Sequence, residues 1–272
     1  MKIDVSKVLE DKNPKLARKI PKFFIHWLKK IIHENEINEF LEKYGEKTGI
    51  PFCEEVIKYF NIEIDIYNIE NIPKNRRYIF VSNHPLGGFD GIILMKLIKE
   101  IFGDIKVPVN DILMNIPNLK ELFIPINKHG HQSKEVAIAM DRFFMSDIPI
   151  LTFPAGLCSR KIKGKIIDLE WKKNFIIKAV ESQRDIVPIF FEGRNSNFFY
   201  NLANLRKRVG IKSNFEMIFL VDELFKHRNK RFKVFFGKVI PYESIDKSKS
   251  TYQWAQEIKN IVYSIPYNFT KI

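Results

Sequence analysis

The sequence predicts an α/β fold, in which a single domain with a mostly parallel central sheet flanked by helices follows a helical N-terminal segment. Two observations predict it. From about residue 62 onward, short runs rich in β-branched and aromatic residues alternate with longer helical stretches, which is typical of parallel sheets. Before residue 61, apolar residues instead recur at helical spacings. We therefore expect a helical segment over residues 1–60 and an α/β domain over residues 61–272.

The first predicted helix lies in IPKFFIHWLKKII, residues 20–32, with Pro21 at its first helical position. Its apolar residues recur at spacings of three and four, and several lysines surround them. A basic amphipathic helix that carries Trp and Phe is suited to the interfacial zone of an anionic bilayer. Phe23, Phe24 and Trp27 are therefore candidate membrane contacts. The same pattern also fits a helix that packs on the protein's own core and turns its lysines to solvent.

The polar stretch HENEINEFLEKYGEK, residues 33–47, predicts a second helix that ends near Gly45 or Gly49. Beyond it, seven apolar runs predict strands, and three longer stretches between them predict helices. The strands are expected over residues 62–67, 77–82, 105–109, 122–126, 149–153, 186–191 and 232–237, and the helices over residues 91–102, 134–145 and 171–182. In such folds the functional residues gather on loops at the carboxyl ends of the strands.

The composition narrows the choice of partners. Forty-five Lys and Arg against 32 Asp and Glu give a formal net charge of +13, which favours nucleic acid, an anionic membrane or an acidic carrier protein as partner. The aromatic residues lie in apolar runs and no nucleic-acid-binding motif is present, which argues against nucleic acid. Two cysteines, no signal peptide and no apolar run of about twenty residues predict a cytoplasmic protein without a transmembrane helix.

One loop follows the carboxyl end of a predicted strand, which is where catalytic residues of α/β proteins usually lie. VSNHPLGGFDGII, residues 81–93, carries His84 and Asp90 between a predicted strand and a predicted helix. Imidazole accepts protons near neutral pH, and a nearby carboxylate can hold it in the required tautomer. Gly87 and Gly88 would let the backbone turn tightly enough for the two side chains to meet. Taken alone, Asp90 is equally explained as a helix N-cap and His84 as a histidine satisfied within a turn.

Four motifs in the same order carry a resemblance to a known family. They are NHPLGGFDG at residues 83–91, LFIPINK at 122–128, FPAGLCSR at 153–160 and IVPIFFEG at 186–193. Together they resemble the motifs of the glycerolipid (lysophospholipid) acyltransferase superfamily, which includes 1-acylglycerol-3-phosphate acyltransferases. Five residues rather than the usual four separate His84 from Asp90, and Ala155, Cys158 and Lys128 replace the Glu and the two Arg of the common motifs. This form is similar to the haemolysin-like branch, which is related to enzymes that O-acylate lyso-ornithine and lyso-glycine lipids.

The resemblance implies acyl transfer from an acyl carrier protein or coenzyme A thioester to the hydroxyl of a lyso-lipid, with no metal or other cofactor. His84 would act as general base and Asp90 would orient it. The implied substrate-binding residues are Asn83, Gly87, Gly88, Lys128, Phe153, Pro154, Gly156 and Arg160. The resemblance also implies a peripheral protein on the cytoplasmic face of the inner membrane. Because the common Glu and Arg accompany a phosphate-bearing acceptor, their loss favours an amino-acid lyso-lipid.

Several alternatives remain open from the sequence. The acceptor could still be 1-acylglycerol-3-phosphate, or the acyl group could pass to water as in a thioesterase. A membrane-binding protein that has lost catalysis would keep the same scaffold. Cys158 could also act as a covalent nucleophile with His84 as its base.

Overall fold

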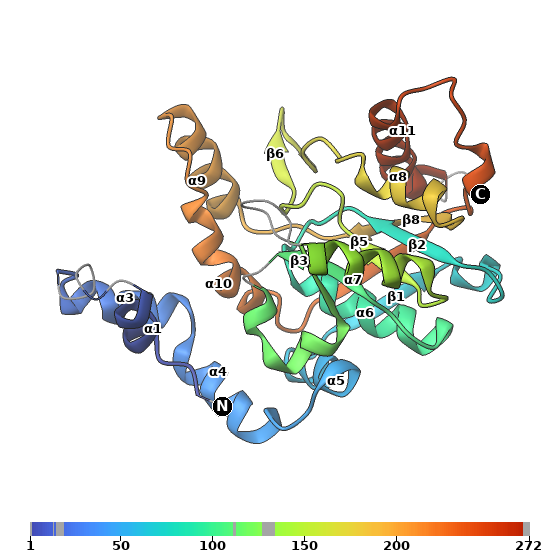
Figure 1. The fold of residues 1–272 in the computed structure, drawn as a ribbon. Helices are drawn as coiled ribbons and strands as arrows, with labels where there is room; N and C mark the ends of the chain where they lie inside the picture. Colours follow the sequence, from blue (N-terminus) through green and yellow to red (C-terminus); the bar gives the residue numbers. More distant parts are fainter. Residues whose placement is uncertain (1, 13, 15–18, 111–112, 127–133, 269–272) are drawn as a thin grey trace.

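The computed structural model describes residues 2–12, 14, 19–110, 113–126 and 134–268. Its central sheet has five strands in the order β1 (Glu63–Tyr67), β9 (Arg231–Phe236), β8 (Asp185–Glu192), β2 (Tyr78–Ser82) and β5 (Ile150–Thr152) (Figure 1). Neighbouring strands are parallel except for β8 and β9. Strands β3 (Val107–Asn110) and β4 (Phe123–Ile126) form a separate parallel pair. All seven predicted strands are thus present, and the mostly parallel sheet is confirmed.

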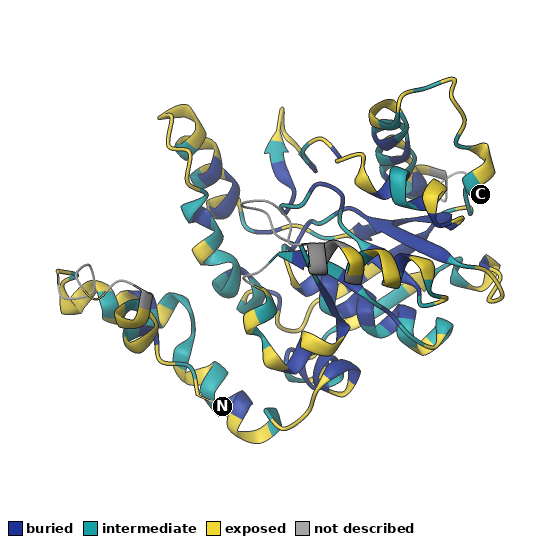
Figure 2. Ribbon diagram, in the orientation of Figure 1, coloured by how far each residue is buried: buried dark blue, intermediate teal, exposed yellow. Residues whose placement is uncertain are grey.

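Helices cover both faces of the central sheet because β2 is apolar on both sides. Ile79 and Val81 face one hydrophobic cluster, which α8 (Asn174–Glu181) and α11 (Thr251–Ser264) complete. Tyr78 and Phe80 face the opposite cluster, which α5 (Gly49–Tyr59) and α6 (Phe89–Phe102) complete. This two-faced burial is the pattern of a parallel strand between two helical layers. Figure 2 shows β2 and β8 as the most deeply buried part of the molecule.

The N-terminal segment is helical, as predicted. It contains α1 (Val5–Lys12), α3 (Lys22–Ile31), which follows Pro21, and α4 (Glu34–Tyr44), which ends at Gly45. Helix α5 was not predicted, because Gly49 begins this helix instead of ending the one before it. Phe52, Cys53 and Val56 of α5 lie in the same core as the sheet. None of the helices in the described part of the chain is long and apolar enough to cross a bilayer.

The predicted helices after residue 90 correspond to α6, α8 and α7 (Lys134–Met145). The structure adds elements that were not predicted: the hairpin β6 (Arg160–Ile162) and β7 (Lys165–Ile167), and helices α9 (Asn197–Arg208), α10 (Leu220–Phe225) and α11. The described residues also form short 3₁₀ helices: η1 (Ile69–Asn71), η2 (Leu113–Asn115), η3 (Pro117–Leu122), η4 (Phe215–Phe219), η5 (Tyr242–Ser244) and η6 (Ile265–Asn268).

Candidate active site

His84 and Asp90 come together at the carboxyl end of β2. Strand β2 delivers His84, and the loop turns back so that Asp90 lies in the first turn of α6. The His84 Nδ1 atom is 3.0 Å from Asp90 Oδ1. Gly87 makes the turn possible, because its φ of +76° is left-handed and an added Cβ would lie 3.0 Å from Cys158. Gly88 does not use that freedom, since its φ of 164° is extended.

Asp90 is fully buried and holds the loop as well as the imidazole. Its carboxylate accepts hydrogen bonds from the backbone N–H groups of Leu86, Gly88 and Gly91 at 2.9 to 3.1 Å. Burial alone would raise the pKa of Asp90. The nearby His84 and these backbone donors oppose burial, and the pKa lies below its usual value. Asp90 is therefore ionised at neutral pH. It fixes Nδ1 as the protonated nitrogen of a neutral His84, which leaves Nε2 as the nitrogen that can accept a proton.

Sequence reasoning missed Asp168, which holds the backbone of His84. The buried Asp168 carboxylate accepts hydrogen bonds from the His84 N–H at 3.2 Å, the Ser159 hydroxyl at 2.6 Å and the Trp171 indole at 2.9 Å. Burial raises the pKa of Asp168, although these donors oppose the rise. The Ser159 N–H also donates to the His84 carbonyl at 2.8 Å. An acid between two apolar residues and close to a tryptophan, as in IIDLEW, was the available signal.

His84 lies at an apolar cleft of about 270 Å³. Phe153 and Gly156 line the cleft beside it, and the Phe153 ring centroid is 4.2 Å from that of His84. The loop contributes Gly87 and Gly88. The far wall consists of apolar side chains from α6, β3, β4 and the segment that contains η2 and η3: Met95, Val107, Val109, Ile116, Leu119 and Phe123. Among the described residues the structure therefore gathers His84, Gly87, Gly88, Phe153 and Gly156 in one apolar site.

A second apolar hollow, of about 580 Å³, lies between the N-terminal helices and the core. It shares Ile92, Ile116, Leu119 and Leu224 with the cleft. These four residues therefore form a wall between the cleft beside His84 and the hollow beneath α1 and α4. Apolar surface continues from the loop that carries His84 toward the N-terminal segment.

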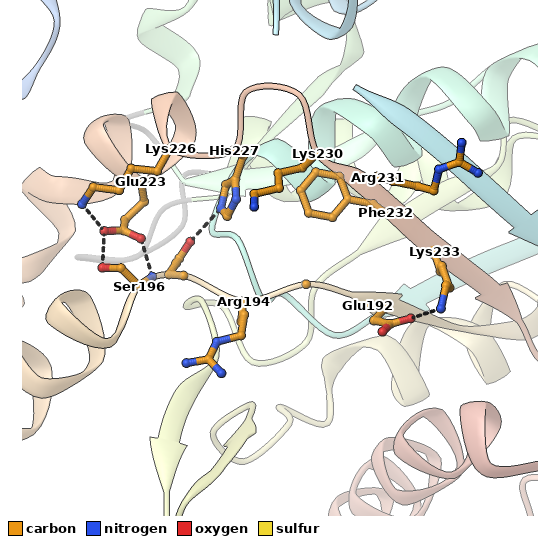
Figure 3. A pocket seen from close by; sticks show the side chains of 12 residues that line it. Glu192, Arg194, Ser196, Glu223, Lys226, His227, Lys230, Arg231, Phe232 and Lys233 are labelled. Atoms are coloured by element: carbon orange, nitrogen blue, oxygen red, sulfur yellow. Dashed lines mark hydrogen bonds and ion pairs between the residues drawn. The ribbon is translucent and has the colours of Figure 1, made fainter. Parts of the chain in front are cut away.

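A third, polar hollow of about 630 Å³ lies behind the loop (Figure 3). In it, Glu223 accepts hydrogen bonds from Ser196 and Lys226, and the Nε2 atom of His227 is 3.3 Å from Asn195 Oδ1. Burial lowers the pKa of His227 despite the nearby Glu223. The hollow is close to the back of the loop, because an added Cβ on Gly193 would lie 3.1 Å from Leu86. Sequence reasoning also missed these residues, of which His227 lies against the loop with its ring centroid 6.4 Å from that of Phe89.

Three of the implied substrate-binding residues do not line the cleft. Asn83 spans from the end of β2 to β8, where it donates to the Phe191 carbonyl and accepts from the Phe191 N–H. The Pro154 carbonyl accepts a hydrogen bond from the Lys172 N–H. Arg160 is buried, 3.0 Å from Glu216 in an ion pair, and borders a different hollow. Lys128, with His129 and His131, lies outside the described residues.

Cys158 is poorly placed for nucleophilic catalysis. Its side chain is buried and does not line the cleft. Burial raises the pKa of the thiol to about 11, even though Arg160 donates a hydrogen bond to Sγ at 2.9 Å. A thiolate is the reactive form of cysteine, and it is scarce at neutral pH when the pKa is this high.

The three candidate membrane contacts lie on the outside of α3. Phe23 is 75% exposed, and Phe24 and Trp27 are each 41% exposed. Leu28 of the same helix is buried, so the apolar residues of α3 divide between an inner and an outer face.

Comparison with known proteins gives a consistent result. A family model described as acyltransferase matches residues 7–266. The chain is 50% identical over 264 residues to a lyso-glycine lipid O-acyltransferase of Bacteroides thetaiotaomicron, with 97% of each chain covered. It is 47% identical to the lyso-glycine lipid O-acyltransferase of Phocaeicola vulgatus, covering 97% of this chain and 95% of that one. A solved structure, the 1-acyl-sn-glycerophosphate acyltransferase PlsC of Thermotoga maritima, matches with a TM-score of 0.49 and 16% identity over 90% and 92% of the two chains. The chain belongs to the acyltransferase family.

Proposed function

We propose that this protein moves a fatty acyl group from an acyl thioester, carried by acyl carrier protein or coenzyme A, to the hydroxyl of a lyso-lipid at a membrane surface. One observation carries the proposal. An ionised, buried Asp90 lies 3.0 Å from His84 beside an apolar cleft. General-base activation of a hydroxyl needs the first feature, and an acyl chain needs the second. The family membership and the O-acyltransferase names of the relatives support the same reaction.

In the proposed reaction, His84 Nε2 removes the proton of the acceptor hydroxyl as that oxygen attacks the thioester carbonyl. The C–O bond forms, the negative charge passes to the carbonyl oxygen, and Asp90 stabilises the imidazolium. When the tetrahedral intermediate collapses, the C–S bond breaks and His84 returns its proton to the leaving thiolate. The reaction is balanced without a metal or a redox cofactor.

The Gly87 N–H is the best candidate for the oxyanion donor among the four glycines that line the cleft. The Gly88 and Gly91 N–H groups already donate to Asp90, and the Gly156 N–H donates to the Phe153 carbonyl. The Gly87 N–H has no such acceptor in the described part of the chain. One well-placed donor of this kind contributes about 2.7–4 kcal/mol to transition-state stabilisation.

We propose that the acceptor is an amino-acid lyso-lipid and that Lys172 binds its carboxylate. The relatives' names specify a lyso-glycine lipid, and a lipid joined to glycine through the amine keeps a free carboxylate. Arg160 is occupied by Glu216. The Lys172 ammonium, in contrast, lies 3.5 Å from the Cβ position of Gly156 at the cleft. It has no ion-pair partner among the residues that the structure describes, and its backbone N–H anchors it to Pro154.

The N-terminal segment fits the role of a peripheral membrane anchor in this proposal. Phe23, Phe24 and Trp27 are exposed beside the cations of α3, as an anionic interface requires. The apolar hollow beneath α1 and α4 adjoins the cleft, so an acyl chain could pass from the bilayer side toward His84 without crossing polar surface.

The test is transfer of labelled acyl groups from a thioester to a lyso-glycine lipid in detergent. His84→Ala should lower turnover by about 10²–10⁴-fold, the usual contribution of a general base. His26→Ala, which changes an exposed histidine of α3, is the matched control and should keep full turnover. Unchanged turnover in a folded His84→Ala protein would refute the assigned base. Labelled free fatty acid in place of labelled lipid would identify a thioesterase instead.

A further inference from the structure

Helix α9 has apolar residues on two sides, and only one side is covered. Phe199, Tyr200 and Ala203 form the inner side and are buried around Cys158. Phe198, Leu202, Leu205 and Val209 follow one another at spacings of four, three and four, which places them on a single outer stripe. Phe198 is 51% exposed, Leu205 57% and Val209 59%. A helix that is apolar on both sides normally has a neighbour on each.

The outer stripe joins the exposed face of α3 through a chain of aromatic rings. The Phe198 ring centroid is 5.1 Å from that of Phe219, and Phe219 is 5.9 Å from Trp27. Trp27 in turn is 5.1 Å from Phe24. We call the outer stripe with its exposed neighbours Ile211 and Ile218 the α9 face. Two elements far apart in sequence therefore expose one continuous apolar surface, on the side where Figure 1 shows α3 and α9.

Every charged residue in the segment that contains α9 is a cation. Residues 193–215 contain no Asp or Glu. Lys207, Arg208 and Lys212 are exposed at the end of α9, whereas Arg206 is turned inward to Glu216. An exposed apolar stripe with flanking cations matches a surface of anionic lipid head groups over acyl chains. A second copy of this chain fits less well, because a two-fold contact through the α9 face would bring the same cations of both copies together.

We infer that the α9 face is a second membrane-contact surface, which enters the interface of an anionic bilayer together with Phe23, Phe24 and Trp27. The protein would then rest on the bilayer through two elements, α3 and α9, that lie on the same side of the molecule (Figure 1). The inference rests on the proposed function only in that the acceptor is a membrane lipid. Binding itself is measured without catalysis.

The first test is sedimentation with vesicles of equal parts phosphatidylethanolamine and phosphatidylglycerol. A Phe198→Ser, Leu205→Ser, Val209→Ser triple variant should bind about tenfold more weakly, because it loses apolar surface that the interface would bury. The control is Asn201→Ser, an exposed polar position of the same helix, which should bind like the unchanged protein. Full turnover of the triple variant on a lyso-lipid in detergent micelles would show that its fold and active site are intact. His84→Ala should bind vesicles normally, which separates this inference from the proposed reaction.

The second test uses the burial of both native cysteines, Cys53 and Cys158. An environment-sensitive thiol probe attached at Leu205→Cys should shift to the blue when vesicles are added, whereas the same probe at Asn201→Cys should not. Equal vesicle binding by the triple variant, or no spectral shift at position 205, would overturn the inference. It would also be overturned if the unchanged protein were a dimer that the triple variant dissociates while vesicle binding persists.

Discussion

The carboxylate of Asp90 links the His84 imidazole, the proposed general base, to the loop that presents it. Its two oxygen atoms lie within hydrogen-bonding distance of His84 and three backbone N–H groups. Since it is completely buried, none of these partners can be replaced by water. The tautomer of His84 therefore depends on Asp90, while Asp168 and Ser159 also hold the His84 backbone.

Asp90→Asn should lower kcat by about 10²–10⁴-fold. The amide nitrogen cannot accept a hydrogen bond from the His84 Nδ1–H, and the imidazolium loses the negative charge that stabilises it. Stability should fall by about 1.5–3 kcal/mol with the loss of charge-assisted hydrogen bonds. Acyl-transfer kinetics and thermal unfolding measure the two effects. Asp104→Asn, a half-buried position just beyond the other end of α6, is the control and should leave kcat unchanged. Near-normal kcat in Asp90→Asn would show that His84 does not need this carboxylate.

Lys172→Ala should raise KM for an acceptor with a free carboxylate by about tenfold or more, the loss expected for one charge-assisted hydrogen bond. KM for the methyl ester of the same acceptor should change little, because the ester carries no charge for the lysine to bind. The neighbouring exposed Lys173→Ala is the control and should leave both values unchanged. An equal rise for acid and ester would contradict carboxylate recognition.

For single residues, the sequence predicted the loop that carries His84 and Asp90, but not the interaction partners of every motif residue. His84 and Gly87 follow β2, and Phe153 and Gly156 follow the neighbouring parallel strand β5, so the carboxyl ends of the two strands bring them together. Arg160 was expected to hold an anionic group, yet Glu216, 56 residues away, occupies it. Asp168 went unnoticed because its link to His84 spans 84 residues. Such long-range pairing leaves no periodicity that a sequence can display.

Helices and strands whose apolar residues follow one clear pattern could be predicted from the sequence. Those whose ends or buried sides depend on contacts with distant parts of the chain could not. The runs of β2 and β8 are apolar on both faces, so their strands were evident. Helix α5 was missed because Gly49 resembles a helix end, although its φ of +58° lets it begin the next helix. Helix α9 combines a buried and an exposed apolar side, so no clear amphipathic period marks it.

Ile116 belongs to the wall shared by the cleft and the hollow under α1 and α4. Ile116→Trp should narrow the passage between the cleft and this hollow. We expect kcat/KM for a palmitoyl thioester to fall about tenfold, because about two methylenes of the chain would no longer be buried, at a loss of ~0.8 kcal/mol each. Turnover of hexanoyl thioester should be unaffected, because a short chain does not reach this wall. Lys120→Trp, on the exposed side of η3, is the control. A uniform loss over all chain lengths would mean that the acyl chain does not pass Ile116.

In the whole molecule, the two parts of the N-terminal segment differ in how much they contribute to the hydrophobic core around the sheet. Residues before 33 contribute only Val5 and Leu28 to the buried core within the described ranges. Residues 33–60 contribute Phe40, Leu41, Phe52, Val56 and Phe60, among others, to the same cluster as β2 and β8. The division at residue 60, which the change in hydrophobic pattern predicts, therefore cuts through a shared hydrophobic core.

Two truncations would measure how far the α/β domain extends. A protein that begins at residue 33 should unfold cooperatively with a modest loss of Tm. One that begins at residue 61 should lack a cooperative transition, because each large apolar side chain removed from the core forfeits ~1.5–3 kcal/mol while total stability is only ~5–15 kcal/mol. Thermal unfolding followed by circular dichroism, with size-exclusion chromatography to detect aggregates, distinguishes them. A sharp transition for residues 61–272 alone would establish that the first 60 residues are a separable appendage, since the core around α6 would then close without Phe52 and Phe60.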